Sequence, residues 1–255
     1  MEGIMDLIFS QYQLFLLVMV RTSGIFIFSP FFSSQNIPNI MKIGLTFSLS
    51  LLISTTLSYT VDFTNEMLIL ILFKELMVGI IIGFISYAFF STFYVMGQII
   101  DMKIGFGMVN VIDPQNRVQV PLMGNFYYIL VFLLMLGING HHQIILALID
   151  SYKFLPIGSF KYTGDTMNLL INTLVKSFEI GFKLSTPIVA IIFITDIILG
   201  IISKTIPQMN VFVVGMPLKI IIGLFMIMVS IPVFFSSIEG IFALIINNIY
   251  MFMKI

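Results

Sequence analysis

Residues 76–100 read Leu-Met-Val-Gly-Ile-Ile-Ile-Gly-Phe-Ile-Ser-Tyr-Ala-Phe-Phe-Ser-Thr-Phe-Tyr-Val-Met-Gly-Gln-Ile-Ile, without a single charge. A helix needs about 20 apolar residues to cross roughly 30 Å of hydrocarbon, so this stretch is long enough for one crossing. Other long uncharged stretches are 22–41, 43–61, 118–149 and 220–238. Over the whole chain 59% of the 255 residues are hydrophobic and 9% are charged, whereas a soluble domain carries about 25% charge. The composition therefore indicates an integral membrane protein.

The spacing of the charges predicts an all-α, polytopic membrane protein, because no stretch alternates in polarity as a transmembrane strand does. We expect six long apolar helices, at about 7–28, 41–59, 67–90, 124–146, 178–201 and 211–235. A seventh apolar stretch, 238–253, follows Pro232 and Glu239. It is either a bent continuation of the sixth helix or an interfacial helix.

Composition also excludes several functions. Twelve basic and twelve acidic residues cancel, which leaves no net field to attract nucleic acid. The chain has no cysteine, and its two histidines, His141 and His142, are adjacent. Adjacent helical residues point about 100° apart, so they do not converge on one metal. Without a GxSxG, HExxH or P-loop pattern, we expect no enzyme, no cofactor and no metal site.

Six charged residues fall inside the expected helices, where a central charge costs about 2.5–3.5 kcal/mol on the insertion scale. They are Arg21, Lys74, Glu75, Glu179, Lys183 and Asp196. Glu179 and Lys183 are four residues apart and can neutralise each other. Arg21 has no partner one turn away. We therefore expect it to meet a carboxylate or a carbonyl in a larger assembly that contains this chain. These charges either pair inside a helix bundle or line a hydrated route.

The segment 97–124 is broken by Gly105, Gly107, Pro114 and Pro121, yet it is too apolar for a freely solvated loop. Irregular backbone at membrane depth is tolerated where it is buried in protein or lines an aqueous cavity. The segment is therefore either a structural connector or a loop that occupies a pore.

Four motifs stand in order over nearly the whole chain. The first two are Arg21-Thr-Ser-Gly-Ile-Phe-Ile-Phe-Ser-Pro30 with Pro38, and Asp101 with Gly105-Phe-Gly and Asp113-Pro114. The other two are Asn139-Gly-His-His142 with Ser151-Tyr152 and Pro156, and Ile206-Pro-Gln-Met-Asn-Val-Phe212 with Gly215, Pro217 and Lys219. Together they resemble the FliR family of the bacterial type III export apparatus. The Asn-Gly-His-His element resembles flagellar members more than the related injectisome subunit.

The resemblance implies a subunit of the flagellar export gate, in the basal body of the bacterial inner membrane. There the subunit joins FliP-like and FliQ-like subunits, and unfolded flagellar proteins pass through the pore. Residues 1–177 are then a FliP-like part and 178–255 a FliQ-like helical hairpin. The hairpin tip, with Lys204, Pro207, Gln208 and Asn210, is expected to face the cytoplasm and an FlhB-like subunit. An outer 60–66 loop, acidic at Asp62 and Glu66 and free of basic residues, agrees with this orientation.

In such a gate the segment 106–120 is a candidate plug, because a conduit for unfolded chains needs an apolar, deformable seal at rest. Its candidate residues are Phe106, Gly107, Met108, Val109, Asp113, Pro114 and Arg117. Three alternatives remain open: an injectisome subunit of the same family, a small-solute secondary transporter, and a membrane anchor without a conduit. A transporter is expected to show matching repeats, and the two halves of this chain show no convincing similarity.

Overall fold

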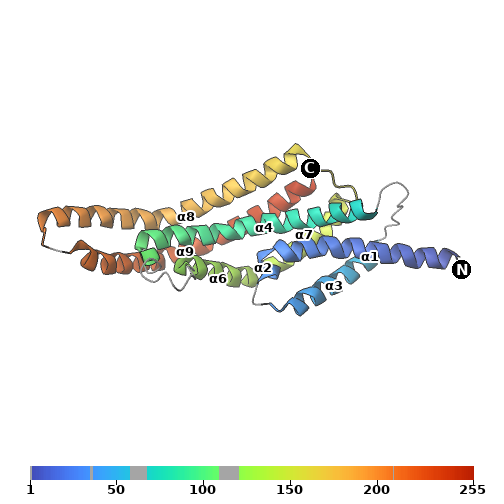
Figure 1. Ribbon diagram of the computed structural model, residues 1–255, viewed down its shortest axis with the longest axis horizontal. Helices are drawn as coiled ribbons and strands as arrows, with labels where there is room; N and C mark the ends of the chain where they lie inside the picture. The colour runs from blue at the N-terminus through green and yellow to red at the C-terminus, as the bar shows by residue number, and fades with distance from the viewer. Residues whose placement is uncertain (1, 35–36, 58–67, 109–120, 209) are drawn as a thin grey trace. The chain divides into compact units, whose positions relative to one another are not determined.

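The computed structural model of the chain describes residues 2–34, 37–57, 68–108, 121–208 and 210–255 (Figure 1). Within these ranges there are helices and no strands, which confirms the all-α class. The helices are α1 (Glu2–Phe28), α2 (Pro30–Ser33), α3 (Asn39–Thr56), α4 (Leu68–Ile104), a 3-10 turn η1 (Phe106–Met108), α6 (Leu122–Gly137), α7 (Gly140–Phe154), α8 (Gly164–Thr205) and α9 (Val211–Met253).

The described helices confirm a polytopic membrane protein but not the count of six crossings. Four of them are long and apolar enough to cross a membrane: α1 over Gln11–Phe28, α4, α8 and α9. The pair α6 and α7, bent by 70°, makes a fifth if it is one broken crossing. The expected crossing at 41–59 is the 18-residue helix α3, which is not among them.

The chain divides into two compact units, and several helices contribute to both. The first unit contains residues 1–88, 136–173 and 243–255. The second contains residues 89–135 and 174–242. The prediction of a FliP-like part and a FliQ-like hairpin divided at residue 178 is not tested by this clustering and stays a prediction.

In the first unit α1 and α4 approach until their backbones touch. A Cβ built on Gly79 of α4 lies 2.1 Å from the carbonyl oxygen of Arg21, and one on Gly83 lies 2.8 Å from Phe28 Cβ. The Gly79-x-x-x-Gly83 step is thus the surface that admits α1. Side chains at helical spacing complete the core: Leu14, Leu17, Val18 and Ile25 from α1, Ile82 and Ile85 from α4, and Ile144, Leu148 and Tyr152 from α7.

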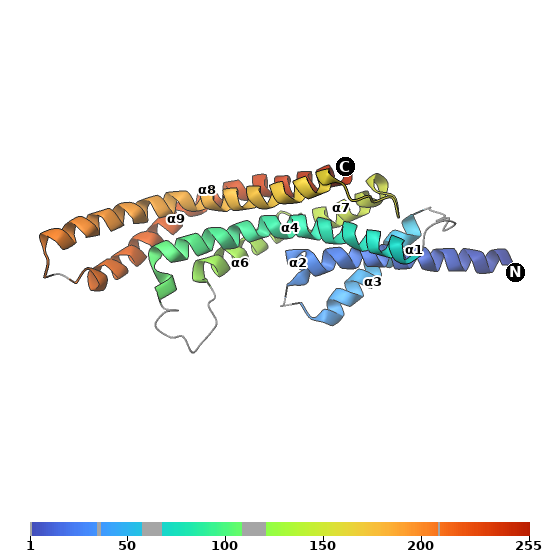
Figure 2. The ribbon, with the colours of Figure 1, turned by 45° about the horizontal axis from the view of Figure 1, so that its top comes forward.

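In the second unit the helices α8 and α9 run side by side as a hairpin, which both ribbon views show (Figures 1 and 2). The second half of α4 packs on α6 through Gly97, whose Cβ position lies 2.3 Å from Gly124 Cα. It packs on α8 through Thr92, whose carbonyl is 2.8 Å from a Cβ built on Gly181. Glycine at these positions lets the helices approach this closely.

Several expected helix ends differ from the structure, and the expected 67–90 helix continues as α4 to Ile104. The expected single segment 124–146 is two helices, because Asn139 adopts a left-handed conformation (φ 56°) that ends α6 and starts α7. Of the two alternatives for 238–253, the structure has the continuation: with 211–235 it forms one 43-residue helix that continues through Pro232. Helix α8 begins at Gly164, fourteen residues before the predicted start at 178, and there the Thr163 hydroxyl accepts a hydrogen bond from Thr166 N (3.3 Å).

Candidate functional site

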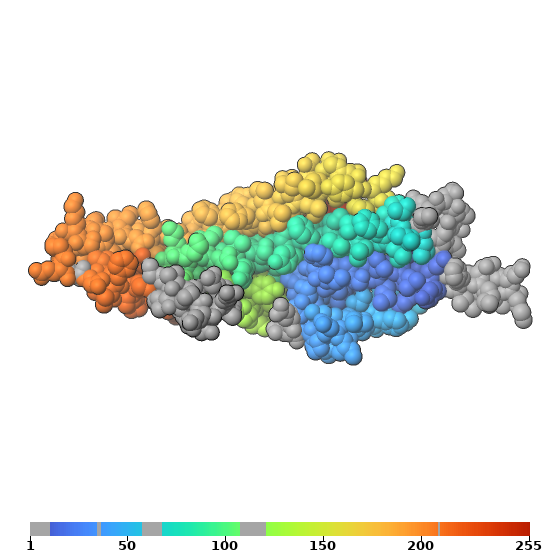
Figure 3. Space-filling model, viewed as in Figure 1, coloured from blue at the N-terminus to red at the C-terminus, as the bar shows by residue number. Residues whose placement is uncertain are grey.

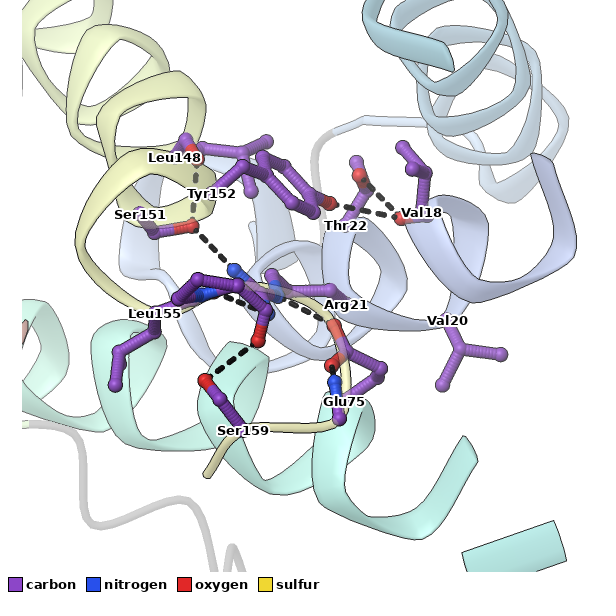
Figure 4. Close-up of polar contacts among 12 residues, drawn as sticks. Val18, Val20, Arg21, Thr22, Glu75, Leu148, Ser151, Tyr152, Leu155 and Ser159 are labelled. Atoms are coloured by element: carbon purple, nitrogen blue, oxygen red, sulfur yellow. Dashed lines mark hydrogen bonds and ion pairs between the residues drawn. The ribbon is translucent and has the colours of Figure 1, made fainter. Parts of the chain in front are cut away.

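The first unit buries an ion pair between α1 and α4. Arg21 Nε lies 2.6 Å from Glu75 Oε2, and both side chains are fully buried. The remaining guanidinium nitrogens donate to Ser151 Oγ and to the carbonyl oxygen of Leu155, each at 3.0 Å (Figure 4). The guanidinium also lies over the Tyr152 ring, 4.2 Å from its centroid. One arginine thus joins α1, α4, α7 and the segment after α7.

The second carboxylate oxygen of Glu75 fixes the turn that follows α7. Glu75 Oε1 accepts a hydrogen bond from Gly158 N (2.9 Å), and Lys74 Nζ donates to Gly158 O (3.1 Å). Gly158 has φ +78°, a conformation that side-chain-bearing residues rarely adopt. Two neighbouring residues of α4 therefore hold both backbone groups of one glycine, and the turn leads into α8.

This network supplies hydrogen-bond acceptors from the same chain to the buried guanidinium of Arg21. A guanidinium has five N–H donors in a planar fork and no acceptor, and here that fork is shared among a carboxylate, a hydroxyl and a carbonyl. Arg21 was expected to meet a carboxylate or a carbonyl, and the same chain supplies both: the carboxylate of Glu75 and the carbonyl of Leu155. The arrangement stabilises the packing of three helices. It leaves the arginine enclosed by protein, not lining a hydrated route.

The other expected intramembrane charges pair close to the surface of the second unit. Lys183 and Glu179 form an exposed pair on α8, with Nζ and Oε1 2.5 Å apart. Asp196 of α8 pairs with Lys219 of α9, and both side chains are partly exposed. Sequence spacing indicates the first pair, whereas the second requires the hairpin to be formed.

The residues expected at the hairpin tip lie where α8 ends and α9 begins. Lys204 is in the last turn of α8, and Pro207 and Gln208 form the exposed turn after it. Asn210 caps α9, because its side-chain oxygen accepts hydrogen bonds from Phe212 N (3.1 Å) and Val213 N (3.4 Å). The tip is thus a polar, capped turn between two apolar helices.

The candidate plug is described only at its beginning. Phe106 and Gly107 are half-buried in the turn η1, which ends at Met108. Val109, Asp113, Pro114 and Arg117 lie outside the described residues. The start of the segment 97–124 is more regular than predicted, since α4 continues helical to Ile104.

The structure adds contacts that the sequence does not indicate. Both carboxylate oxygens of Asp101 lie within 3.1 Å of Met123 N, so the N-terminus of α6 is capped by a residue 22 positions earlier.

His141 stacks on Phe31, with ring centroids 5.4 Å apart, and lies beside His142. In the described ranges no three His, Cys, Asp or Glu side chains are placed to hold a metal.

Comparison with known proteins agrees with the four motifs. The family model described as bacterial export proteins, family 1, matches residues 12–245. The flagellar biosynthetic protein FliR of Bacillus subtilis (strain 168) is 35% identical over 252 residues, which cover 97% of this chain and 96% of the relative. The FliR proteins of Aquifex aeolicus (strain VF5) and Escherichia coli (strain K12) are 31% and 24% identical and cover 80% and 93% of this chain, and 79% and 92% of their own lengths. The chain therefore belongs to the FliR family of bacterial export proteins and is a membrane component of the flagellar export apparatus.

Proposed function

We propose that this chain is one subunit of a gate that passes unfolded flagellar proteins across the bacterial inner membrane. Its neighbours in the gate are FliP-like and FliQ-like subunits, with an FlhB-like subunit at the cytoplasmic entrance. The role is non-enzymatic: the chain builds and shapes the conduit. The observation that carries the proposal is the surface of α8, which suits neither lipid nor water.

Helices α8 and α9 are too long for lipid alone to cover them. They have 42 and 43 residues, so each is about 60 Å long at a rise of about 1.5 Å per residue. The hydrocarbon layer is about 30 Å thick, and transmembrane helices tilt by at most about 40°. Even at that tilt a large part of each helix lies outside the hydrocarbon.

The first half of α8 mixes apolar and charged side chains on its exposed surface. Phe178 and Phe182 are 59% and 57% exposed. Beside them Lys176, Glu179 and Lys183 are exposed as well. Lipid disfavours these charges and water disfavours these rings, whereas the surfaces of other protein subunits can satisfy both. Figure 3 shows α8 at the molecular surface.

The family favours a flagellar export role over the alternatives. The relatives described above are flagellar biosynthetic proteins, which favours the flagellar gate over the injectisome. A homo-oligomeric secondary transporter could also cover a mixed outer surface with its own copies, so the family match, and not this surface, favours the export gate over it. A conduit assembled from several subunits accounts for the surface as well, because each subunit is covered by the next.

Co-purification tests the proposal. We expect the chain, co-expressed with FliP-like and FliQ-like subunits and extracted in mild detergent, to elute with both. Phe178→Asp should abolish the complex while leaving membrane insertion intact, because it adds a charge at the centre of the proposed contact. Lys161→Asp, in the exposed segment before α8, is the matched control and should leave the complex unchanged. Elution of the wild-type chain alone would contradict the proposal.

A further inference from the structure

A cavity in the second unit lies between the end of α4 and the parts of α8 and α9 next to the hairpin tip. Its volume is about 530 Å³, within the range of about 300–1,000 Å³ usual for small-molecule sites. Its walls are mostly apolar and include Ile104, Leu199, Phe212 and Met216. A hollow of this kind is suited to a hydrocarbon chain.

The polar residues around this cavity carry an excess positive charge. Three charged residues line it: Lys103, Lys219 and Asp196. Lys219 and Asp196 pair with each other, so their charges cancel. Lys103 is exposed in the last turn of α4 and makes no ion pair within the described part of the chain. The ligand that complements the cavity is therefore apolar along most of its length and anionic at one end.

We propose that this cavity binds an anionic phospholipid, with the acyl chain against Leu199 and Phe212 and the phosphate at Lys103. Anionic phospholipids lie in the cytoplasmic leaflet, and basic residues at the membrane surface attract them. Gly105, with φ +101°, ends α4 directly after the lysine turn. Lys103 thus lies in the last turn of α4 and in the lining of the cavity. The inference goes beyond the gate role and depends only on the chain lying in a membrane.

The test uses the full chain in nanodiscs and two photoactivatable lipids, phosphatidylglycerol and phosphatidylcholine, with the label on the acyl chain. We expect phosphatidylglycerol to label residues 199–219 about fivefold more than phosphatidylcholine, as one lysine at a membrane surface predicts. Lys103→Gln should bring the ratio to about one, and Lys103→Arg should keep it. Lys161→Gln is the matched control outside the cavity and should leave the ratio unchanged.

A second variant tests the apolar part separately. Gly200 lies in the cavity wall, and a Cβ added there meets no atom within 4 Å. Gly200→Leu should therefore fold normally and lower the labelling by both lipids. Unchanged labelling in a folded Gly200→Leu protein would overturn the placement of the acyl chain.

Three further results would overturn the proposal. Equal labelling of the wild-type chain by both lipids would mean that the cavity does not distinguish an anionic head group from a neutral one. Competition by water-soluble glycerol phosphate would mean that the site takes a free anion. Loss of labelling in the complex with co-purified partner subunits would mean that the cavity is a protein contact. Because partner elution is measured separately, failure of the lipid site and failure of the gate role are distinguishable.

Discussion

At the scale of single residues, Arg21 shows how an apolar helix accommodates a charge. Its guanidinium is fully buried, and Glu75, Ser151 and the Leu155 carbonyl each accept one of its hydrogen bonds. A buried pair adds little net stability, yet removing one partner leaves the other charge buried and uncompensated. The network therefore makes the three helices depend on one another more than it strengthens any one of them.

We expect Arg21→Leu to lower the free energy of unfolding by about 3–5 kcal/mol, because Glu75 is left as an unpaired buried carboxylate. Arg21→Leu combined with Glu75→Leu should recover most of that loss. Unfolding by SDS titration of the detergent-solubilised chain measures both. The matched control is Lys183→Leu, which breaks the exposed pair with Glu179 and should change stability far less. A double variant no more stable than Arg21→Leu alone would contradict a pairwise explanation.

Sequence alone locates these charges but not their partners. Arg21 and Glu75 stand out because each interrupts an apolar helix. Their pairing joins residues 54 positions apart, and no local spacing rule reaches that far. The Glu179–Lys183 pair was predictable, because four residues is one helical turn. Asp101 was missed as a cap, since its partner helix begins 21 residues later.

At the scale of helices, close packing depends on a few glycines. We expect Gly79→Ala to destabilise the chain by about 1–3 kcal/mol, the usual cost of overpacking, because its Cβ lies 2.1 Å from a backbone oxygen of α1. Gly44→Ala in α3 is the matched control, since nothing lies within 4 Å of its Cβ. It should be neutral or stabilising by up to about 1 kcal/mol. Equal effects of the two substitutions in thermal unfolding would contradict the α1–α4 contact.

The cap of α6 gives a separate prediction. Asp101 is 5% exposed and accepts from the first backbone N–H groups of α6, so Asp101→Ala should cost about 1 kcal/mol. Glu239→Ala, at an exposed acidic residue of α9, should cost less. Hydrogen exchange should show faster exchange at Met123 and Gly124 in the Asp101 variant. Unchanged exchange there would mean that the carboxylate does not cap α6.

Apolar stretches predicted the presence of the helices better than their ends. Proline does not end α9 at Pro232, because apolar membrane helices tolerate proline where neighbouring helices and local backbone adjustments satisfy the freed backbone groups. Conversely, the uncharged stretch 118–149 hides the break at Asn139 from a reading based on charge, although the dipeptide Asn139-Gly140 is a turn signal and its left-handed asparagine bends the chain. Hydropathy follows the cost of burying side chains in lipid. It therefore responds neither to a proline that a helix accommodates nor to a left-handed residue that ends a helix.

At the scale of the whole molecule, the orientation of the hairpin follows from the proposed role. The chain has no cysteine, so Gln208→Cys introduces a unique thiol at the exposed tip. We expect a membrane-impermeant maleimide to label it from the cytoplasmic side and not from outside. Lys161→Cys, just before the opposite end of α8, should show the reverse pattern. Labelling of Gln208→Cys from outside would reverse the orientation and remove the proposed FlhB-like contact.

The central claim is that unfolded flagellar proteins pass through a conduit which this chain helps to form. The most direct measurement is photo-cross-linking in flagellated cells, with an export substrate stalled in transit by a fused, tightly folded domain. A photoactivatable residue at Phe106, where the described chain enters the candidate plug segment, should cross-link to the stalled substrate. The same residue at Tyr162, exposed before α8, should not. If the partner subunits cross-link to the substrate and no position of this chain does, the chain is not part of the conduit.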